Sequence, residues 1–383
     1  MKEALVIGGS NGIGLAIVME LQSKSYAVHV VDKEHNDMLD AFPQVDFTQT
    51  NLISTDYSFL QQFQNIDTLV ITTGFGRIAP FEDLIGQEIQ NSFQVNAVAA
   101  TRILHHFFPR MKQVEPFQCS VMGSIAGLIC SPLFATYGAT KAALCNVIES
   151  LNIELEMSGT DNRILNVSPG SIKGTRFNGG DNDLSQTTTL AKTIISKMES
   201  RQTLWIPQYE EVFQQVMERY RQDPRKFGLE SYDFKMKSGR ASNKPQLKVG
   251  YLSGTFDLFH IGHLNLLRNA KQRCDYLVVG VHKDASHKGK DAFIPFEERM
   301  DIVRNIKYVD KVIPSEKEDC DVYLKGIVKY DYLFVGSDYK GSERFNRYEQ
   351  IFKDTNVKIV YFPYTKGTSS TQLRDALTYI HTH

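Results

Sequence analysis

The chain has 383 residues, enough for two globular domains that each bury a core. Apolar residues make up 42% and charged residues 23%, and a formal net charge of -1 argues against a general affinity for nucleic acid or membranes. Five scattered cysteines argue against a disulfide framework and against a zinc site, and a reducing cytoplasm fits them best. The first residues lack a signal-peptide pattern, and no apolar run approaches the length of a membrane span, so we expect neither.

The first half alternates short apolar runs with amphipathic stretches. The pattern predicts buried strands at Ala4–Ile7, Ala27–Val31, Thr68–Thr72, Cys119–Met122 and Ile164–Val167. Helical patterns lie between them, as at Gly14–Gln22 and Ala139–Met157. This alternation predicts an α/β fold with a parallel, doubly wound, Rossmann-like sheet.

A polar segment divides the chain. Gln208–Arg221 has a helical pattern, and Lys235–Lys248 is basic and poor in strand residues, as linkers often are. The alternation then restarts, with predicted strands at Val249–Leu252, Tyr276–Val281, Tyr332–Val335 and Lys358–Phe362 and helices at His263–Gln272 and Pro295–Asn305. We therefore expect one domain over residues 1–235, a linker over 236–247 and a second α/β domain over 248–383.

A glycine-rich turn follows the first strand and begins the first helix. It comprises Gly8, Gly9, Ser10, Asn11, Gly12, Ile13 and Gly14. Glycines at such a turn let the backbone approach a pyrophosphate, whose charge is favoured by the helix N-terminus. The position between strand and helix favours dinucleotide binding over the alternative of tight packing alone.

Asp32 ends the second predicted strand. A carboxylate there accepts hydrogen bonds from ribose hydroxyls and repels a 2′-phosphate, which favours NAD(H) over NADP(H). A solvated turn aspartate is the alternative. Lys33 follows directly and would soften the preference, so both cofactors remain open.

Tyr137 and Lys141 lie one helical turn apart on the same helix face. A phenol has an ordinary pKa of about 10, and a nearby ammonium makes proton transfer from it feasible. Such a pair is common on ordinary helices. Here Ser124 ends a preceding strand, where its hydroxyl could bind a carbonyl or an alcohol.

Residues from about 1 to 235 resemble the short-chain dehydrogenase/reductase family. The resemblance rests on the glycine-rich turn, Asp46, Asn96, Ser124, Tyr137, Lys141 and the Pro169-Gly170 turn, in the family's order and spacing. It implies hydride transfer with Tyr137 as general acid or base, Lys141 lowering its pKa and binding the nicotinamide ribose, Ser124 positioning the carbonyl and Asn96 supporting a proton relay. It also implies that Asp46, Gly74, Pro169, Gly170 and Thr175 contact the cofactor.

This half departs from the family pattern at two places. Ile7 replaces the threonine usual before the glycine turn, and residues 71–74 read Ile-Thr-Thr-Gly in place of Asn-Asn-Ala-Gly. These changes concern the sheet and the support of the cofactor, and they leave the reacting groups in place.

In the second half, the segment Gly254–His263 directly follows a predicted strand. It ends with two histidines three residues apart, His260 and His263, with Gly262 between them. No further ligand at suitable spacing supports a metal site, and a core histidine is the plain alternative for either residue. The glycine lets the backbone approach a phosphate while both imidazoles reach the same anion. The pattern therefore indicates a site that binds a nucleoside triphosphate during attack on its α-phosphorus.

Residues 247 to 377 resemble the cytidylyltransferases that make CDP-glycerol, and more distantly those that use phosphocholine. The family pattern covers Gly254, Thr255, Phe256, Asp257, His260, Gly262 and His263, the loop residues Asp284, Lys288 and Lys290, the helix residue Arg299, and the closing residues Thr365, Ser369 and Ser370. It implies catalysis by His260, His263, Lys288 and Arg299, and binding of CTP with Mg²⁺ by the others. ATP is the alternative nucleotide.

Two arginines of that family are replaced, by Tyr364 and Lys307. Loss of a bidentate arginine should weaken or reshape triphosphate binding. Arg344, Lys366 and Arg374 are the candidates to compensate.

Fusion of two such domains suggests consecutive reactions. The pairing of the two resemblances favours reduction of a ketose phosphate to a polyol phosphate, followed by coupling of the polyol phosphate to CTP. The first choice is ribulose 5-phosphate, which would give ribitol 5-phosphate and then CDP-ribitol, a precursor of surface polymers. CDP-glycerol or another CDP-polyol is the next choice. The first domain could instead be a non-catalytic cofactor-binding module, or could act after activation. We expect small-molecule substrates and a homo-oligomer.

Overall fold

The structure is a computed structural model that describes residues 2–175, 177, 182–239, 247–283, 292–315, 318–363, 365, 367–368 and 372–374. The chain divides into two compact units, residues 1–246 and 247–383. The linker expected from residue 236 begins later, because helix α7 (Pro224–Lys237) continues through Lys237. Every helix among the described residues is too short or too polar to span a bilayer.

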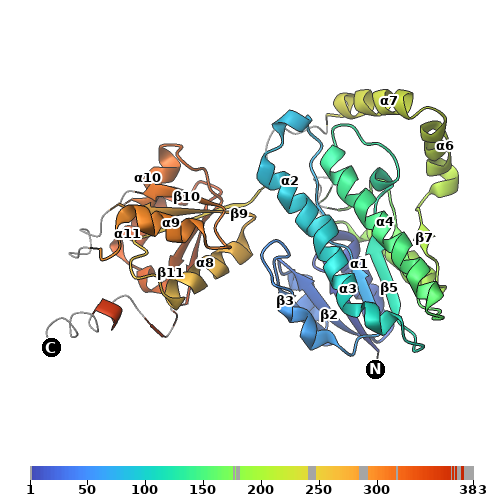
Figure 1. Cartoon of the computed structure of the whole chain (residues 1–383), viewed down its shortest axis with the longest axis horizontal. Helices are drawn as coiled ribbons and strands as arrows, with labels where there is room; N and C mark the ends of the chain where they lie inside the picture. Colours follow the sequence, from blue (N-terminus) through green and yellow to red (C-terminus); the bar gives the residue numbers. More distant parts are fainter. Residues whose placement is uncertain are drawn as a thin grey trace. The chain divides into compact units, whose positions relative to one another are not determined.

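The first unit contains a seven-stranded parallel sheet (Figure 1). Its strands are β1 (Glu3–Ile7), β2 (Ala27–Asp32), β3 (Val45–Gln49), β4 (Thr68–Ile71), β5 (Gln118–Met122), β6 (Ile164–Val167) and β7 (Leu204–Trp205). Their order is β3-β2-β1-β4-β5-β6-β7, so the direction of winding reverses between β1 and β4. This order confirms the predicted doubly wound sheet and places the ligand-binding switch point at the carboxyl ends of those two strands.

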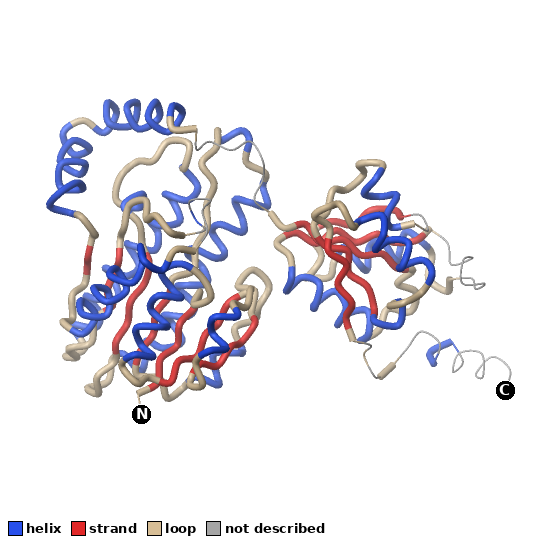
Figure 2. Tube along the Cα trace, turned by 180° about the vertical axis from the view of Figure 1, so that it is seen from behind, coloured by secondary structure: helices blue, strands red, loops and turns tan. Residues whose placement is uncertain are grey.

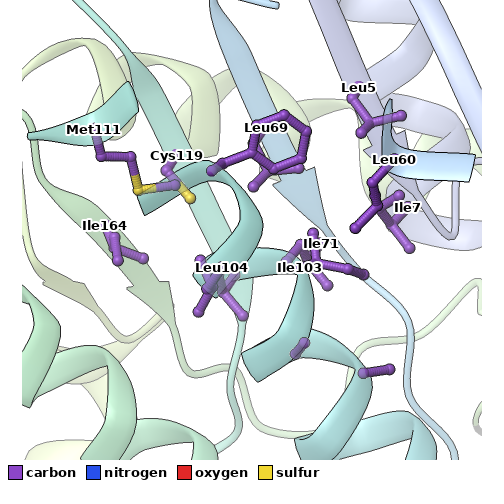
Figure 3. Packing of buried hydrophobic residues seen from close by; sticks show 14 of the residues in the cluster. Leu5, Ile7, Leu60, Leu69, Ile71, Ile103, Leu104, Met111, Cys119 and Ile164 are labelled. Atoms are coloured by element: carbon purple, nitrogen blue, oxygen red, sulfur yellow. The ribbon is translucent and has the colours of Figure 1, made fainter. Parts of the chain in front are cut away.

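Helices cover both faces of this sheet (Figure 2). On one face α1 (Gly12–Ser23) and α5 (Leu184–Glu199) pack together, and on the other lie α3 (Ala100–Met111) and α4 (Ala135–Met157). The core under α3 and α4 is shown in Figure 3, where Leu5, Ile7, Leu69 and Ile71 meet Ile103 and Leu104. Strand residues alternate between the two faces, so that Ala4 and Val6 pack under α1.

Three further helices complete this unit. Helix α2 (Gly86–Phe93) runs into a π-helical turn, Gln94–Ala99, before α3. Helix α6 (Gln214–Gln222) precedes α7, and neither contains a buried residue.

The second unit contains a five-stranded parallel sheet of order β10-β9-β8-β11-β12. Its strands are β8 (Val249–Gly254), β9 (Tyr276–His282), β10 (Lys311–Ser315), β11 (Tyr332–Gly336) and β12 (Lys358–Phe362). Helices α8 (Ile261–Arg273) and α9 (Phe296–Arg304) pack on one face, and α10 (Asp319–Leu324) and α11 (Glu343–Phe352) on the other. Both units are therefore Rossmann-like, as predicted.

Candidate active sites

The glycine-rich turn of the first unit adopts a backbone that only small residues allow. Gly8 has a φ of +90° and Gly12 a φ of +53°. A Cβ on Gly14 would lie 2.0 Å from the carbonyl oxygen of Gly8, so a side chain there would force the helix away from the strand. Ile13, in contrast, packs against the core beneath α1. The turn thus presents backbone amides at the start of α1.

Asp32 holds this turn in place. Its carboxylate accepts from the amide of Ser10 at 3.1 Å and from the amide of Lys33 at 2.7 Å. Burial raises the pKa of Asp32, although these backbone hydrogen bonds act in the opposite direction. The carboxylate therefore stands at the end of β2, where an adenosine ribose is expected.

Two buried hydroxyl groups at the switch point have no hydrogen-bond partner among the described residues. They belong to Ser10 in the glycine-rich turn and to Thr73 after β4. Unsatisfied buried hydroxyls are costly, so their presence fits a site that a polar ligand completes. The departure at Ile7 is compensated, because the neighbouring Thr72 hydroxyl lies 2.9 Å from the Gly8 carbonyl and 3.2 Å from the Ile7 carbonyl.

Other residues also surround the turn. The amide of Gly12 donates to the Asn182 side chain at 3.0 Å, and Asn182 donates to Asn11 at 2.8 Å. Thr175, buried, lies beside Gly12. No sequence pattern pointed to Asn182, since its proximity arises from a fold contact across 170 residues.

The expectation for Asp46 is corrected. This residue is the second of the edge strand β3, where it pairs with His29, and its carboxylate lies 3.5 Å from His29 Nδ1 with 82% of the side chain exposed. It therefore lies short of the strand end at which Asp32 stands. Asn51, buried just after β3, is the polar residue at that edge, which the search for a charged residue missed.

Ser124, Tyr137 and Lys141 come together at the carboxyl end of β5. All three are buried, and the Ser124 hydroxyl is hydrogen-bonded to the Tyr137 phenol. The Lys141 ammonium donates to the Met122 carbonyl at 2.7 Å and lies 5.8 Å from the centre of the Tyr137 ring. A Cβ on Gly74 would approach this ammonium to 3.1 Å, so Gly74 leaves the ammonium accessible from the cofactor side.

Burial sets the ionisation of this group. It raises the pKa of Tyr137 to about 12, against a lowering by the Ser124 hydrogen bond. It also lowers the pKa of Lys141 to about 8. The expected lowering of the tyrosine pKa by Lys141 is therefore not found, because the ammonium is itself desolvated and turned toward the Met122 carbonyl.

Asn96 lies in the π-helical turn and is fully buried. Its amide donates to the Phe75 carbonyl at 2.8 Å and to Thr140 at 3.0 Å, while its oxygen accepts from the Phe75 amide at 3.0 Å. The side chain thus ties the loop after β4 to the helix that carries Tyr137. π-Turns occur frequently at functional sites.

The remaining predicted cofactor residues lie after β6. The Pro169 carbonyl accepts from the Ile125 amide at 3.1 Å and lies 3.5 Å from the Ser124 hydroxyl. Gly170 is needed because a Cβ there would lie 2.2 Å from the Phe213 ring. Phe134 stacks on Tyr137 with ring centres 4.2 Å apart, an aromatic wall that sequence reasoning did not identify.

In the second unit, His260 and His263 stack at the start of α8, with ring centres 4.0 Å apart and an angle of 30°. The Gly262 amide donates to His260 Nδ1 at 3.0 Å, and a Cβ on Gly262 would lie 2.8 Å from the ring. With Nδ1 as acceptor, the neutral ring carries its proton on Nε2, a donor for phosphate. Burial lowers the pKa of His260, which favours that neutral form.

The loop between β8 and α8 is strained and firmly held. Phe256, buried in the core, has a φ of +53°. Asp257 accepts from the amides of Phe293 and Ile294 and pairs with Arg374. Burial acts to raise the pKa of Asp257, but these hydrogen bonds and Arg374 outweigh it, and the net direction is down.

Gly254, the last residue of β8, and Thr255 adjoin this loop. Gly254 packs against the Phe256 ring, which a Cβ would approach to 3.1 Å. The Thr255 hydroxyl is buried and has no hydrogen-bond partner among the described residues. Like Ser10 in the first unit, it fits a site that a polar ligand completes.

Arg299 is 1% exposed and donates to backbone carbonyls throughout. Nη1 donates to Thr255 and His282, Nη2 to Lys283 and Nε to Ile294. Burial lowers its pKa, against a raising effect of Asp257. This arrangement makes Arg299 a brace between β8, β9 and the start of α9, whereas the sequence suggested direct contact with phosphate.

The closing segment returns to α8. The Asn265 amide lies 3.5 Å from the Thr365 hydroxyl, and Gly367 faces Ile261. Predicted nucleotide-binding residues from both ends of the unit therefore converge on the first turns of α8. Lys288, Lys290, Ser369 and Ser370 lie outside the described residues.

Two protein-family models match the chain. Residues 2–184 match the short chain dehydrogenase model, and residues 251–376 match the cytidylyltransferase-like model. The glycerol-3-phosphate cytidylyltransferase of Bacillus subtilis is 38% identical over 129 residues, covering 32% of this chain and 92% of that protein. The first unit is a short-chain dehydrogenase domain and the second belongs to the cytidylyltransferase-like family.

Further relatives agree with this assignment. The glycerol-3-phosphate cytidylyltransferase of Staphylococcus aureus is 35% identical over 130 residues, covering 32% of this chain and 90% of that protein. A short-chain dehydrogenase structure from Streptomyces avermitilis has a TM-score of 0.51 at 19% identity, covering 62% of this chain and 99% of that one. This last likeness concerns the fold alone. The chain is thus a bifunctional enzyme, an oxidoreductase fused to a cytidylyltransferase.

The burial of Lys141 predicts a pH limit on reduction by the dehydrogenase domain. With a pKa of about 8, Lys141 is charged below pH 8 and neutral above it. Loss of this charge removes stabilisation of the phenolate that forms when Tyr137 gives up its proton. We expect kcat/KM for reduction to be level below pH 8 and to fall by about tenfold per pH unit above it. Cytidylyl transfer by the same chain is the internal control, and a level reduction profile to pH 10 would contradict the assignment.

Arg299→Lys should destabilise the cytidylyltransferase domain. A lysine cannot reach all four carbonyls, so buried acceptors lose their partners at a cost of about 2–4 kcal/mol. Denaturant titration with hydrogen exchange resolved by domain should show the second unit weakened and the first unchanged. Arg304→Lys on the same helix, at an exposed pair with Asp301, is the matched control. A stable Arg299→Lys protein with a raised KM for CTP would favour the phosphate contact instead.

Proposed function

We propose that this enzyme reduces a ketose phosphate to a polyol phosphate and then transfers a cytidylyl group from CTP to it. The observation that carries the proposal is the presence, in one chain, of a buried Ser124–Tyr137–Lys141 group and a stacked His260–His263 pair. The product class of the first chemistry is the acceptor class of the second.

In the reduction, the glycine-rich turn and Asp32 would hold a nicotinamide cofactor, which would supply the hydride for the carbonyl carbon. The Tyr137 phenol, protonated at neutral pH because its pKa is raised to about 12, gives its proton to the carbonyl oxygen. Ser124 holds that oxygen beside the phenol. Lys141, charged below pH 8, offsets the negative charge left on the phenolate.

In the transfer, an oxygen of the acceptor phosphate attacks the α-phosphorus of CTP. The new P–O bond forms as the bond to the β-phosphate breaks, and pyrophosphate leaves with the electron pair. Nε2–H of His260, with His263 beside it, would donate to the triphosphate. The buried Thr255 hydroxyl would also form a hydrogen bond to the triphosphate. Mg²⁺ would accompany CTP, bound largely through phosphate oxygens.

Our first choice is ribulose 5-phosphate as the substrate and CDP-ribitol as the final product. CDP-glycerol is the second, because the relatives of the cytidylyltransferase domain carry glycerol-3-phosphate in their names. We place both reactions in the cytoplasm and expect a homo-oligomer.

The two half-reactions should be separable by mutation. Purified protein incubated with NADH or NADPH, CTP and single ketose phosphates should yield a CDP-polyol by mass spectrometry. Tyr137→Phe, which cannot give a proton, should abolish reduction by at least about 10³-fold while leaving transfer to supplied ribitol 5-phosphate intact. His260→Ala should do the reverse.

The same screen separates the alternatives. Unchanged transfer to a supplied polyol phosphate by Tyr137→Phe, with no oxidation of NAD(P)H by the wild type on any ketose phosphate, would show that the dehydrogenase domain is a non-catalytic module. Oxidation of NAD(P)H only with a CDP-linked sugar would show that reduction follows activation. ATP in place of CTP tests the nucleotide.

Asp32 predicts a preference for NADH. Its carboxylate stands at the end of β2 and would repel a 2′-phosphate. Asp32→Asn keeps the acceptor for the Ser10 amide and removes the charge, so KM for NADPH should fall by about tenfold with KM for NADH little changed. Equal KM values for both cofactors in the wild type would contradict this preference.

A further inference from the structure

A largely buried network of polar side chains lies at the carboxyl end of β8. Its cation is Arg344, which the sequence suggested only as a substitute for a missing phosphate-binding arginine. The Ser253 hydroxyl contacts His282 Nε2 at 3.1 Å and is hydrogen-bonded to the Asp319 carboxylate. The second oxygen of Asp319 accepts from Arg344 Nη2 at 3.0 Å. Together these contacts hold the Arg344 guanidinium near the carboxyl end of β8.

This network of polar side chains lies on the face of the sheet opposite the histidine pair. In β8, Tyr251 packs against the residues of α11, and Leu252 against those of α8. Ser253 points to the same side as Tyr251 because strand side chains alternate. The end of β8 is therefore flanked by the start of α8, with His260 and His263, on one face and by Arg344 on the other.

Arg344 is fixed before any ligand arrives. Nε donates to the Tyr348 hydroxyl at 2.9 Å, and Tyr348 in turn donates to Glu318 at 2.7 Å and accepts from the Asp319 amide at 3.0 Å. The Arg344 side chain still keeps 29% of its surface exposed. A guanidinium held in this way loses little further freedom on binding an oxyanion.

Displacement at phosphorus places the attacking and leaving oxygens on opposite sides. If the triphosphate lies at the start of α8, pyrophosphate departs on that face, and the attacking phosphate approaches from the face of α11. We propose that Arg344 binds the phosphate of the polyol phosphate acceptor, with Asp319 and Tyr348 as positioning residues. This inference rests on the cytidylyl transfer proposed above.

The charge balance gives the site a second signature. Burial raises the pKa of Asp319 to about 6, despite the lowering effects of the Ser253 hydrogen bond and the Arg344 charge. A phosphate dianion on Arg344 competes with Asp319 for the guanidinium and favours the protonated carboxyl. The titratable and charged groups that interact with Asp319 are Glu318, Arg344, Tyr251, Tyr330 and Tyr348. Ser253 connects Asp319 to His282. Acceptor binding should therefore take up a proton near pH 7.5, where the acceptor phosphate is already almost entirely the dianion.

The test is steady-state transfer by the full-length protein with ribitol 5-phosphate or sn-glycerol 3-phosphate as acceptor. Arg344→Gln should raise the acceptor KM by at least about tenfold and change the KM for CTP by less than about twofold. Arg344→Lys, which keeps the charge but not the fork, should fall between. Lys353→Gln at the end of the same helix removes an equal charge at an exposed position and should leave both constants unchanged.

A wild-type measurement covers the case in which Arg344→Gln fails to fold. Calorimetry of acceptor binding at pH 7.5 in buffers of different ionisation enthalpy should show proton uptake, and its absence would overturn the inference. A raised KM for CTP alone, or equal effects in Arg344→Gln and Lys353→Gln, would also overturn it. Transfer by the wild type with no effect of Arg344→Gln would overturn this inference only, whereas no nucleotidyl transfer to any phosphate acceptor would overturn the proposed function with it.

Discussion

Both active sites depend on one backbone constraint, a sharp turn from the first strand of a parallel sheet into the following helix. In the dehydrogenase domain the turn is made with glycines, and Gly14 approaches the Gly8 carbonyl so closely that any side chain would separate strand from helix. In the cytidylyltransferase domain Phe256 and Leu258 themselves take positive φ angles. That strain is held by burial of the Phe256 ring and by the backbone amides that bind the Asp257 carboxylate.

The elements with strong apolar patterns were predictable, and the weakly patterned edges were not. The central strands of both sheets were found because buried parallel strands are nearly continuous apolar runs. Helices such as α8 were found because their apolar residues recur with the helical period. Strands β3, β7 and β10 were missed. Their sequences are VDFTQ, the two residues LW, and KVIPS with an internal proline, and at or near a sheet edge the pairing partner decides their conformation.

The same limit applies to the sites. Motif spacing located the phenol, the ammonium and both histidines, because each lies within one turn of a helix or at a strand end. It misplaced Asp46, since strand register, not sequence distance from a motif, sets which residue reaches the edge of the sheet. Asn182 and Asp319 reach their partners across 171 and 66 residues, a proximity that no local pattern encodes.

Lys141 and Arg299 show why residue type alone does not give a role. Both are buried cations in family positions, and both have their pKa lowered by burial. Lys141 donates to one carbonyl and lies beside the Tyr137 ring and Gly74, which leaves its charge within reach of a ligand. Arg299 donates to four carbonyls from three segments, so its guanidinium is already hydrogen-bonded to the backbone that positions Thr255. The number of acceptors already satisfied distinguishes a cation that acts on a ligand from one that builds the site.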